Sequence, residues 1–164
     1  MYRTPKDLPQ VAIRRENWSL ADRIEVAAQN DSRLVQFSPL ARFCAVAISM
    51  VEQPGEIYNG NCCGIMCQGE SFPWGWHKDT WEKVKPVGYV LLKEGLTGKT
   101  APFLAFETVL DSFYILCQKV ERREIYSGEA YCTRWVGLST PDKRTIQAFE
   151  NACNKILEKA GWKR

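Results

Sequence analysis

SPLARFCAVAISMVE, residues 38–52, is the strongest helix signal in the sequence. Ser38 and Pro39 form a typical pair of N-cap and first-turn residues. Apolar side chains then recur at helical spacing, at Leu40, Phe43, Cys44, Ala47, Ile48 and Val51. Pro54 and Gly55 follow and cannot continue the helix. We therefore predict a core helix that ends just before Pro54.

Capping patterns predict three more helices, each ahead of an apolar stripe. The expected starts are Ser19 with Asp22, Thr108 with Asp111, and Thr140-Pro141-Asp142. The stripes are Ile24, Ala27 and Ala28; Leu110, Phe113, Cys117 and Val120; and Ile146, Phe149, Cys153, Ile156, Leu157 and Ala160. We expect the first helix to end near Gln29 and the last near Gly161. Val87–Lys93 and Thr100–Phe106 are extended in character and predict a hairpin.

These elements predict an α+β fold with a helical body and an inserted lobe. The lobe, about residues 55–106, holds the loop-rich segment and the hairpin. Residues 1–18 read as an irregular arm, because Pro5 and Pro9 interrupt any regular element. We expect residues 19–164 to form a single domain.

Length and composition exclude several classes of protein. The chain has 164 residues, of which 45% are hydrophobic and 25% charged, as in an ordinary globular domain. It has no apolar run long enough to span a membrane and no repeats. The net charge of +3 is spread along the chain, so we do not expect nucleic acid as a partner. Nothing in the sequence indicates the oligomeric state.

The N-terminus lacks the continuous apolar core of a secretory signal. Any export would then need another route, a removed leader, a phage particle or a secretion apparatus.

The seven cysteines favour buried thiols over a disulfide framework, because a domain of this size does not need one. Cys44, Cys117 and Cys153 fall on the predicted apolar stripes. The alternative interpretation is a zinc site, because cysteine and histidine are zinc ligands and four of them lie close in the sequence: Cys62, Cys63, Cys67 and His77. Their spacing is not a standard zinc pattern, and we expect no metal.

Glu52 is the strongest candidate for chemistry. It ends the core helix predicted over residues 38–52, at the edge of the apolar stripe, so its carboxyl should emerge half buried. Partial burial and the negative end of a helix dipole both raise a carboxyl pKa. A carboxyl that stays protonated near neutral pH is suited to protonating the leaving oxygen of a glycosidic bond. The alternative is a solvated residue at a helix end.

Four blocks of the sequence, in order, resemble the glycoside hydrolase family 73 domains, the glucosaminidases that cleave bacterial peptidoglycan. They are AISMVE (47–52), similar to the helix end that carries the family's catalytic Glu; NCCGIM (61–66), similar to "NLFGIK"; FLAFETVLDS (103–112), similar to "FRAYDSLEDS"; and YCT (131–133), similar to "YATDP".

The resemblance implies a lysozyme-like fold with a cleft between the helical body and the small lobe, where the glycan strand lies. It implies that Glu52 is the general acid, that Asn61 and Gly64 shape the cleft wall, and that Tyr131 lies near the reacting sugar. The expected reaction is hydrolysis of a β-1,4 bond, of N-acetylglucosaminidase or muramidase type, without a cofactor. Gln53-Pro54-Gly55 replaces the family's usual Ser-Gly-Trp-Gly. This departure favours the alternative, a glycan-binding or scaffold module that has lost activity.

A glycosidase usually needs a second carboxylate. The candidates in the predicted lobe are Glu56, Glu70, Asp79 and Glu82. We favour Glu70, because the intervening turn can fold it back across the cleft. The N-acetyl group of the substrate is the other possible assistant.

The same lobe is rich in aromatic residues, with Trp74, Trp76 and Trp81 close to Phe72 in the sequence. Outside the lobe, Trp135 follows Tyr131 by four residues. Flat aromatic faces suit the apolar faces of sugar rings. We expect these four tryptophans to bind the glycan; the alternative is that they cover the hydrophobic body.

Overall fold

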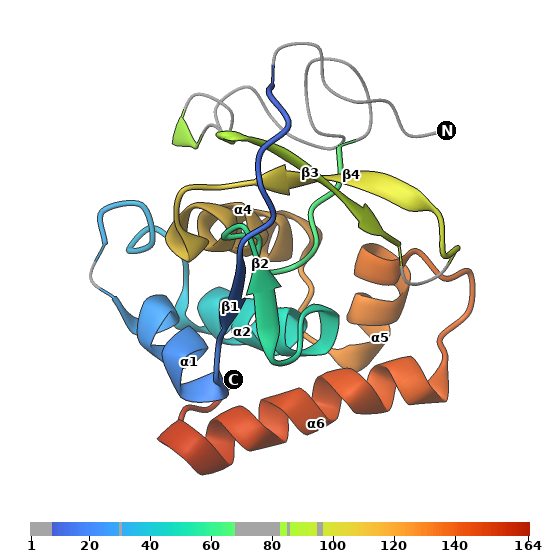
Figure 1. Ribbon diagram of the computed structural model, residues 1–164. Helices are drawn as coiled ribbons and strands as arrows, with labels where there is room; N and C mark the ends of the chain where they lie inside the picture. Colours follow the sequence, from blue (N-terminus) through green and yellow to red (C-terminus); the bar gives the residue numbers. More distant parts are fainter. Residues whose placement is uncertain (1–7, 30, 68–82, 85, 95–96) are drawn as a thin grey trace. The chain divides into compact units, whose positions relative to one another are not determined.

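A computed structural model gives the chain a mixed α+β fold (Figure 1). It describes residues 8–29, 31–67, 83–84, 86–94 and 97–164. The chain divides into two compact units. The first unit holds Met1–Asn17 and Glu56–Ile115, and the second holds Trp18–Gly55 and Leu116–Arg164. The first unit carries the described strands, and the second carries most of the described helices.

Two small antiparallel sheets form the first unit's described strands. Strand β1 (Arg15–Asn17) pairs with β2 (Glu56–Tyr58), and β3 (Gly88–Lys93) pairs with β4 (Thr100–Ala105). The predicted hairpin is confirmed, with Gly88 opposite Ala105 and Lys93 opposite Thr100.

The segment before β1 also belongs to the first unit. The Val11 N–H donates to the carbonyl of Tyr89 at 2.9 Å, and the Tyr89 N–H donates to Pro9 at 3.0 Å. A Cβ on Gly88 would stand 2.5 Å from the Pro9 oxygen, so only glycine allows this approach. The expectation of an irregular stretch is wrong for Arg15–Asn17, because the partner strand lies far along the chain and leaves no local signal.

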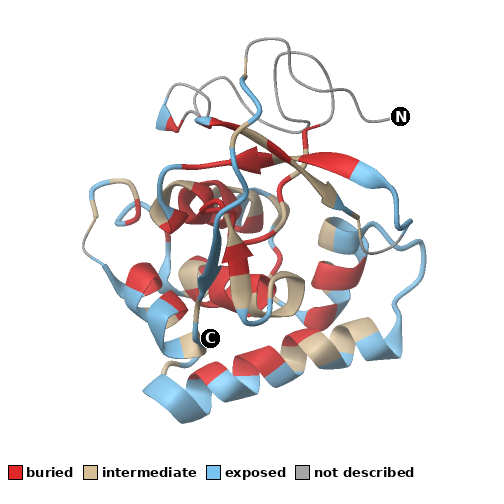
Figure 2. Ribbon diagram, in the orientation of Figure 1, coloured by how far each residue is buried: buried red, intermediate tan, exposed pale blue. Residues whose placement is uncertain are grey.

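The second unit is helical. Its elements are α1 (Leu20–Ala28), α2 (Pro39–Glu52), α5 (Gly128–Ala130), the π-helix η1 (Tyr131–Val136) and α6 (Lys143–Ala160); α4 (Val109–Arg123) begins in the first unit and ends in the second. Helix α2 packs against α1 and α6. Figure 2 shows α2 buried over most of its length, whereas α6 is buried along one side.

Side-chain caps are present at the predicted starts of α1, α2 and α6. The Ser19 hydroxyl accepts the Asp22 N–H at 3.1 Å, and the Asp22 carboxylate accepts the Ser19 N–H at 3.0 Å. The Ser38 hydroxyl accepts the Ala41 N–H at the start of α2, and the Asp142 carboxylate accepts the Thr145 N–H at the start of α6. Polar groups at these positions satisfy backbone N–H groups that have no partner within the helix. Local sequence therefore fixes where α1, α2 and α6 begin.

Two details of the last third of the chain differ from expectation. Leu157 and Ala160, predicted on the buried stripe of α6, are exposed, and Leu157 is 41% accessible. Ile156 is fully buried, and the next residue turns about 100° around the helix, away from the packed side. Helices α5 and η1 were not predicted, because residues 128–136 carry no long apolar stripe.

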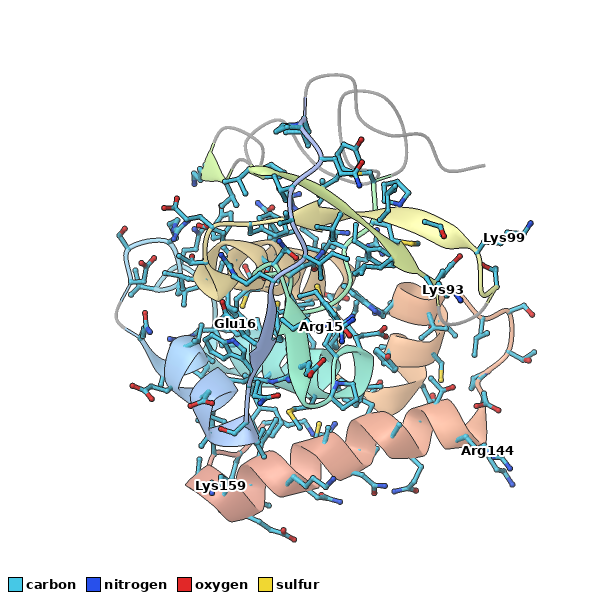
Figure 3. All side chains as sticks on the ribbon, in the orientation of Figure 1. Arg15, Glu16, Lys93, Lys99, Arg144 and Lys159 are labelled. Carbon is cyan, nitrogen blue, oxygen red and sulfur yellow. The ribbon has the colours of Figure 1, made fainter. Side chains whose placement is uncertain are left out.

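All seven cysteines are buried, including the three on the predicted stripes. Within the described ranges, no three His, Cys, Asp or Glu residues group as metal ligands. His77 lies outside those ranges. No described helix combines the length and the apolar character that crossing a membrane requires. Charged side chains such as Lys93 and Lys99 of the hairpin, and Arg144 and Lys159 near the two ends of α6, are exposed (Figure 3).

Candidate functional site in the helical unit

Glu52 is the last residue of α2, and its carboxyl is half buried, as predicted. The last turn of α2 closes normally, with the Gln53 N–H donating to the Ser49 carbonyl at 2.9 Å. Glu52 therefore stands at the end of a helix whose preceding turns are deeply buried.

Tyr131 lies against this carboxyl. Its hydroxyl donates a hydrogen bond to Oε1 of Glu52, although the two residues are 79 positions apart. The tyrosine is only 1% exposed, and its ring stacks on Phe149 of α6 at a centroid distance of 5.5 Å. Tyr131 therefore has little freedom to leave the Glu52 carboxyl.

Trp135 reaches the same oxygen from the same helix. Its indole N–H donates to Oε1 of Glu52 at 3.1 Å. The ammonium of Lys119, on α4, lies 5.7 Å from the centre of the indole ring, within the range of a cation–π contact. Both donors come from η1, and π-helical segments occur often at functional sites.

The environment raises the pKa of Glu52 above its ordinary value. Burial is the largest cause, because it disfavours the carboxylate anion. The hydrogen bonds from Tyr131 and Trp135 favour the anion and oppose part of the rise. The direction agrees with the prediction from the sequence, and it is the direction that a general acid requires.

Arg23, which was not predicted from the sequence, supports the turn that carries Glu52. It is 2% exposed, and its guanidinium donates to the Ser49 carbonyl at 2.8 Å and to the Ser49 hydroxyl at 3.0 Å. A second nitrogen donates to the Trp18 carbonyl at 3.0 Å. The spacing of Arg23 in the sequence could have indicated that it is buried. Arg23 lies three and four residues before the buried Val26 and Ala27, on the same side of α1.

Asn61 and Gly64 lie in the first unit, in the turn that follows β2. The Asn61 amide donates to the carbonyls of Ile65 and Leu104, both at 2.9 Å, and accepts the Ile65 N–H at 2.9 Å. Gly64 has a φ of +67°, a conformation that glycine adopts without strain. The Asn61 side chain therefore stabilises the turn through hydrogen bonds to backbone groups.

Several predicted site residues lie outside the described ranges. They are Glu70, Trp74, Trp76 and Trp81, together with Phe72, Asp79 and Glu82. Their assignments remain predictions. Glu56 is described; it begins β2 in the first unit, opposite Asn17.

The structure thus brings together Glu52, Tyr131 and Trp135 within one unit. Comparisons with protein-family models, with curated proteins and with solved structures find no match to this chain.

Proposed function

We propose that this chain is a peptidoglycan hydrolase that cleaves a β-1,4 glycosidic bond of the glycan strand, with Glu52 as the general acid. The reaction is of N-acetylglucosaminidase or muramidase type. The proposed architecture is lysozyme-like and related to glycoside hydrolase family 73. The mixed α+β fold, with one helical unit and one strand-bearing unit, is consistent with that architecture.

One observation carries this proposal. The resemblance assigns the catalytic acid to Glu52 and a residue beside the reacting sugar to Tyr131, from two separate blocks of sequence. In the folded unit the Tyr131 hydroxyl donates to the Glu52 carboxyl. Two residues 79 positions apart, chosen on sequence grounds alone, form a direct contact, and this agreement supports the resemblance.

The proposed step uses the raised pKa of Glu52. The carboxyl transfers its proton to the glycosidic oxygen as the bond from that oxygen to the anomeric carbon breaks, and the bonding electrons stay with the oxygen. Water then adds its hydroxyl group to the anomeric carbon, and a carboxylate that acts as the base takes up the remaining proton of the water. Glu70 remains the preferred second carboxylate, and the substrate N-acetyl group is the alternative.

Glu52→Gln tests the proposal, because an amide is too weak an acid to protonate the leaving oxygen. We expect release of soluble fragments from purified sacculi to fall by about 10²–10⁴-fold. The matched control is Glu158→Gln, which removes an exposed carboxyl from α6 of the same unit and should leave the rate unchanged. Mass spectrometry of the products would identify the sugar at the new reducing end and so the bond that is cut.

A glycan-binding module without activity is the second candidate, favoured by Gln53-Pro54-Gly55 after the acid. For such a module, wild type and Glu52→Gln would sediment equally with sacculi, and neither would release fragments. Fragment release by the wild type that survives in Glu52→Gln would contradict the role of Glu52.

A further inference from the structure

The two donors at Glu52 reach one and the same oxygen. Tyr131 Oη and Trp135 Nε1 both donate to Oε1, the latter at 3.1 Å. Among the residues that the structure describes, Oε2 accepts no hydrogen bond from a third group. The two carboxyl oxygens therefore have different surroundings.

The chemistry of the two donors determines which oxygen of the Glu52 carboxyl carries the proton. An indole nitrogen can only donate, whereas a phenol can donate or accept. A protonated carboxyl has one carbonyl-type oxygen and one hydroxyl oxygen, and the carbonyl type is the better acceptor. An obligate donor aimed at Oε1 therefore favours the carbonyl character of Oε1.

We infer that Trp135 is a positioning residue, which together with Tyr131 keeps Oε1 of Glu52 as a hydrogen-bond acceptor and leaves the transferable proton on Oε2. This inference rests on the proposed role of Glu52 as an acid. It gives Trp135 a task different from the expected sugar contact, because the polar edge of the ring points at the carboxyl.

The surroundings hold the indole in this orientation. Tyr131 and Trp135 lie one turn apart in η1, and Gly137 ends that helix with a φ of +83°. Lys119 stands over one ring face. The N–H edge is thereby directed at Glu52 before any substrate arrives.

The arrangement also acts after proton transfer. The O–H bond at Oε2 breaks, a new O–H bond forms on the leaving sugar oxygen, and Glu52 becomes an anion. Hydrogen bonds to an ionised acceptor are stronger than those to a neutral one. The contacts at Oε1 therefore strengthen as the proton leaves, which stabilises the product side of the step.

Trp135→Phe tests the inference, because it keeps a ring beneath Lys119 and deletes the donor. We expect kcat to fall by about 10- to 100-fold while KM changes little. Loss of a donor that favours the anion also raises the pKa of Glu52, so the alkaline limb of the pH–rate profile should move to higher pH. Trp162→Phe is the matched control, since Trp162 lies edge-on to Phe43 in the same unit.

A second measurement does not depend on activity. We expect the indole ¹⁵N–¹H resonance that disappears in Trp135→Phe to shift with pH in the wild type and to stay constant in Glu52→Gln. A resonance that ignores pH, or one that titrates equally in Glu52→Gln, would overturn the inference. A rise in KM with an unchanged alkaline limb would also overturn it, since that pattern belongs to a sugar contact.

The two proposals fail separately. Full hydrolysis by Glu52→Gln would remove the proposed function, yet the indole titration would still report whether Trp135 holds the carboxyl. An indole that does not respond to Glu52 would remove the inference and leave the acid role intact.

Discussion

Asn61 and Glu52 are both polar residues surrounded by packed structure, and they use their hydrogen bonds in opposite ways. Asn61 is 3% exposed, and its side chain bonds the carbonyls of Ile65 and Leu104 and the Ile65 N–H, which are backbone groups of its own unit. The half-buried Glu52 carboxyl bonds two side chains through one oxygen, and burial raises its pKa. A buried polar group whose atoms all have hydrogen-bond partners stabilises a fold. A buried polar group with only some of its hydrogen bonds made costs stability but leaves an atom available for reaction.

The largest expected effect on stability is at Asn61. Asn61→Leu leaves the Ile65 N–H and the carbonyls of Ile65 and Leu104 without their partner, so we expect the free energy of unfolding to fall by about 2–5 kcal/mol. Urea denaturation followed by circular dichroism measures it. Asn17→Leu, on exposed strand β1 of the same unit, is the control and should change stability far less. Equal losses in the two variants would remove the distinction drawn for Asn61.

A smaller stability effect is expected at Tyr131, combined with a loss of activity. Tyr131→Phe keeps the stack on Phe149 and removes one hydrogen bond, which corresponds to about 0.5–1.5 kcal/mol in the free energy of unfolding. We expect hydrolysis of sacculi to fall by about tenfold or more, since a proton-transfer geometry is loosened. If Tyr131→Phe destabilises the protein as strongly as Asn61→Leu and hydrolyses normally, Tyr131 is a structural residue like Asn61.

The smallest expected effect on stability has the opposite sign. The folded-state pKa of Glu52 lies above 4.5, so the folded protein binds this proton more tightly than the unfolded chain does. The stability from this proton is present below pH 4.5 and is lost as the pH rises through the folded pKa. Glu52→Gln does not ionise and should therefore melt at a higher temperature than the wild type above that window, with the difference shrinking toward pH 4.5.

Differential scanning calorimetry across this pH range measures the difference, with Glu158→Gln as control. A Glu52→Gln variant that is less stable at every pH would mean that the carboxyl contributes to the fold.

Local signals in the sequence were sufficient for α1, α2, α6 and the hairpin, because caps and apolar stripes act within a few residues of one another. Strand β1 pairs with a strand distant in sequence, and residues 128–136 carry no long apolar stripe, so no local pattern predicted β1 or η1.

Some features of the candidate site were likewise predictable from the sequence, and others were not. The position of Glu52 at the edge of a stripe predicted its half-burial and the direction of its pKa shift. The resemblance supplied Tyr131. The Trp135 indole bond and the Arg23 contacts with Ser49 depend on how separate helices approach one another, which spacing along one helix does not encode.

The buried cysteines give the chain a set of internal reporters. Cys62, Cys63 and Cys67 belong to the first unit, and Cys44, Cys117, Cys132 and Cys153 to the second. Burial raises the pKa of Cys44 and Cys67 to about 12 and that of Cys153 to about 11, so their thiolates are scarce at neutral pH. Thiolates are the species that alkylating reagents attack. Modification of either set therefore records opening of its own unit, and the natural sequence allows the two to be followed separately without an added label.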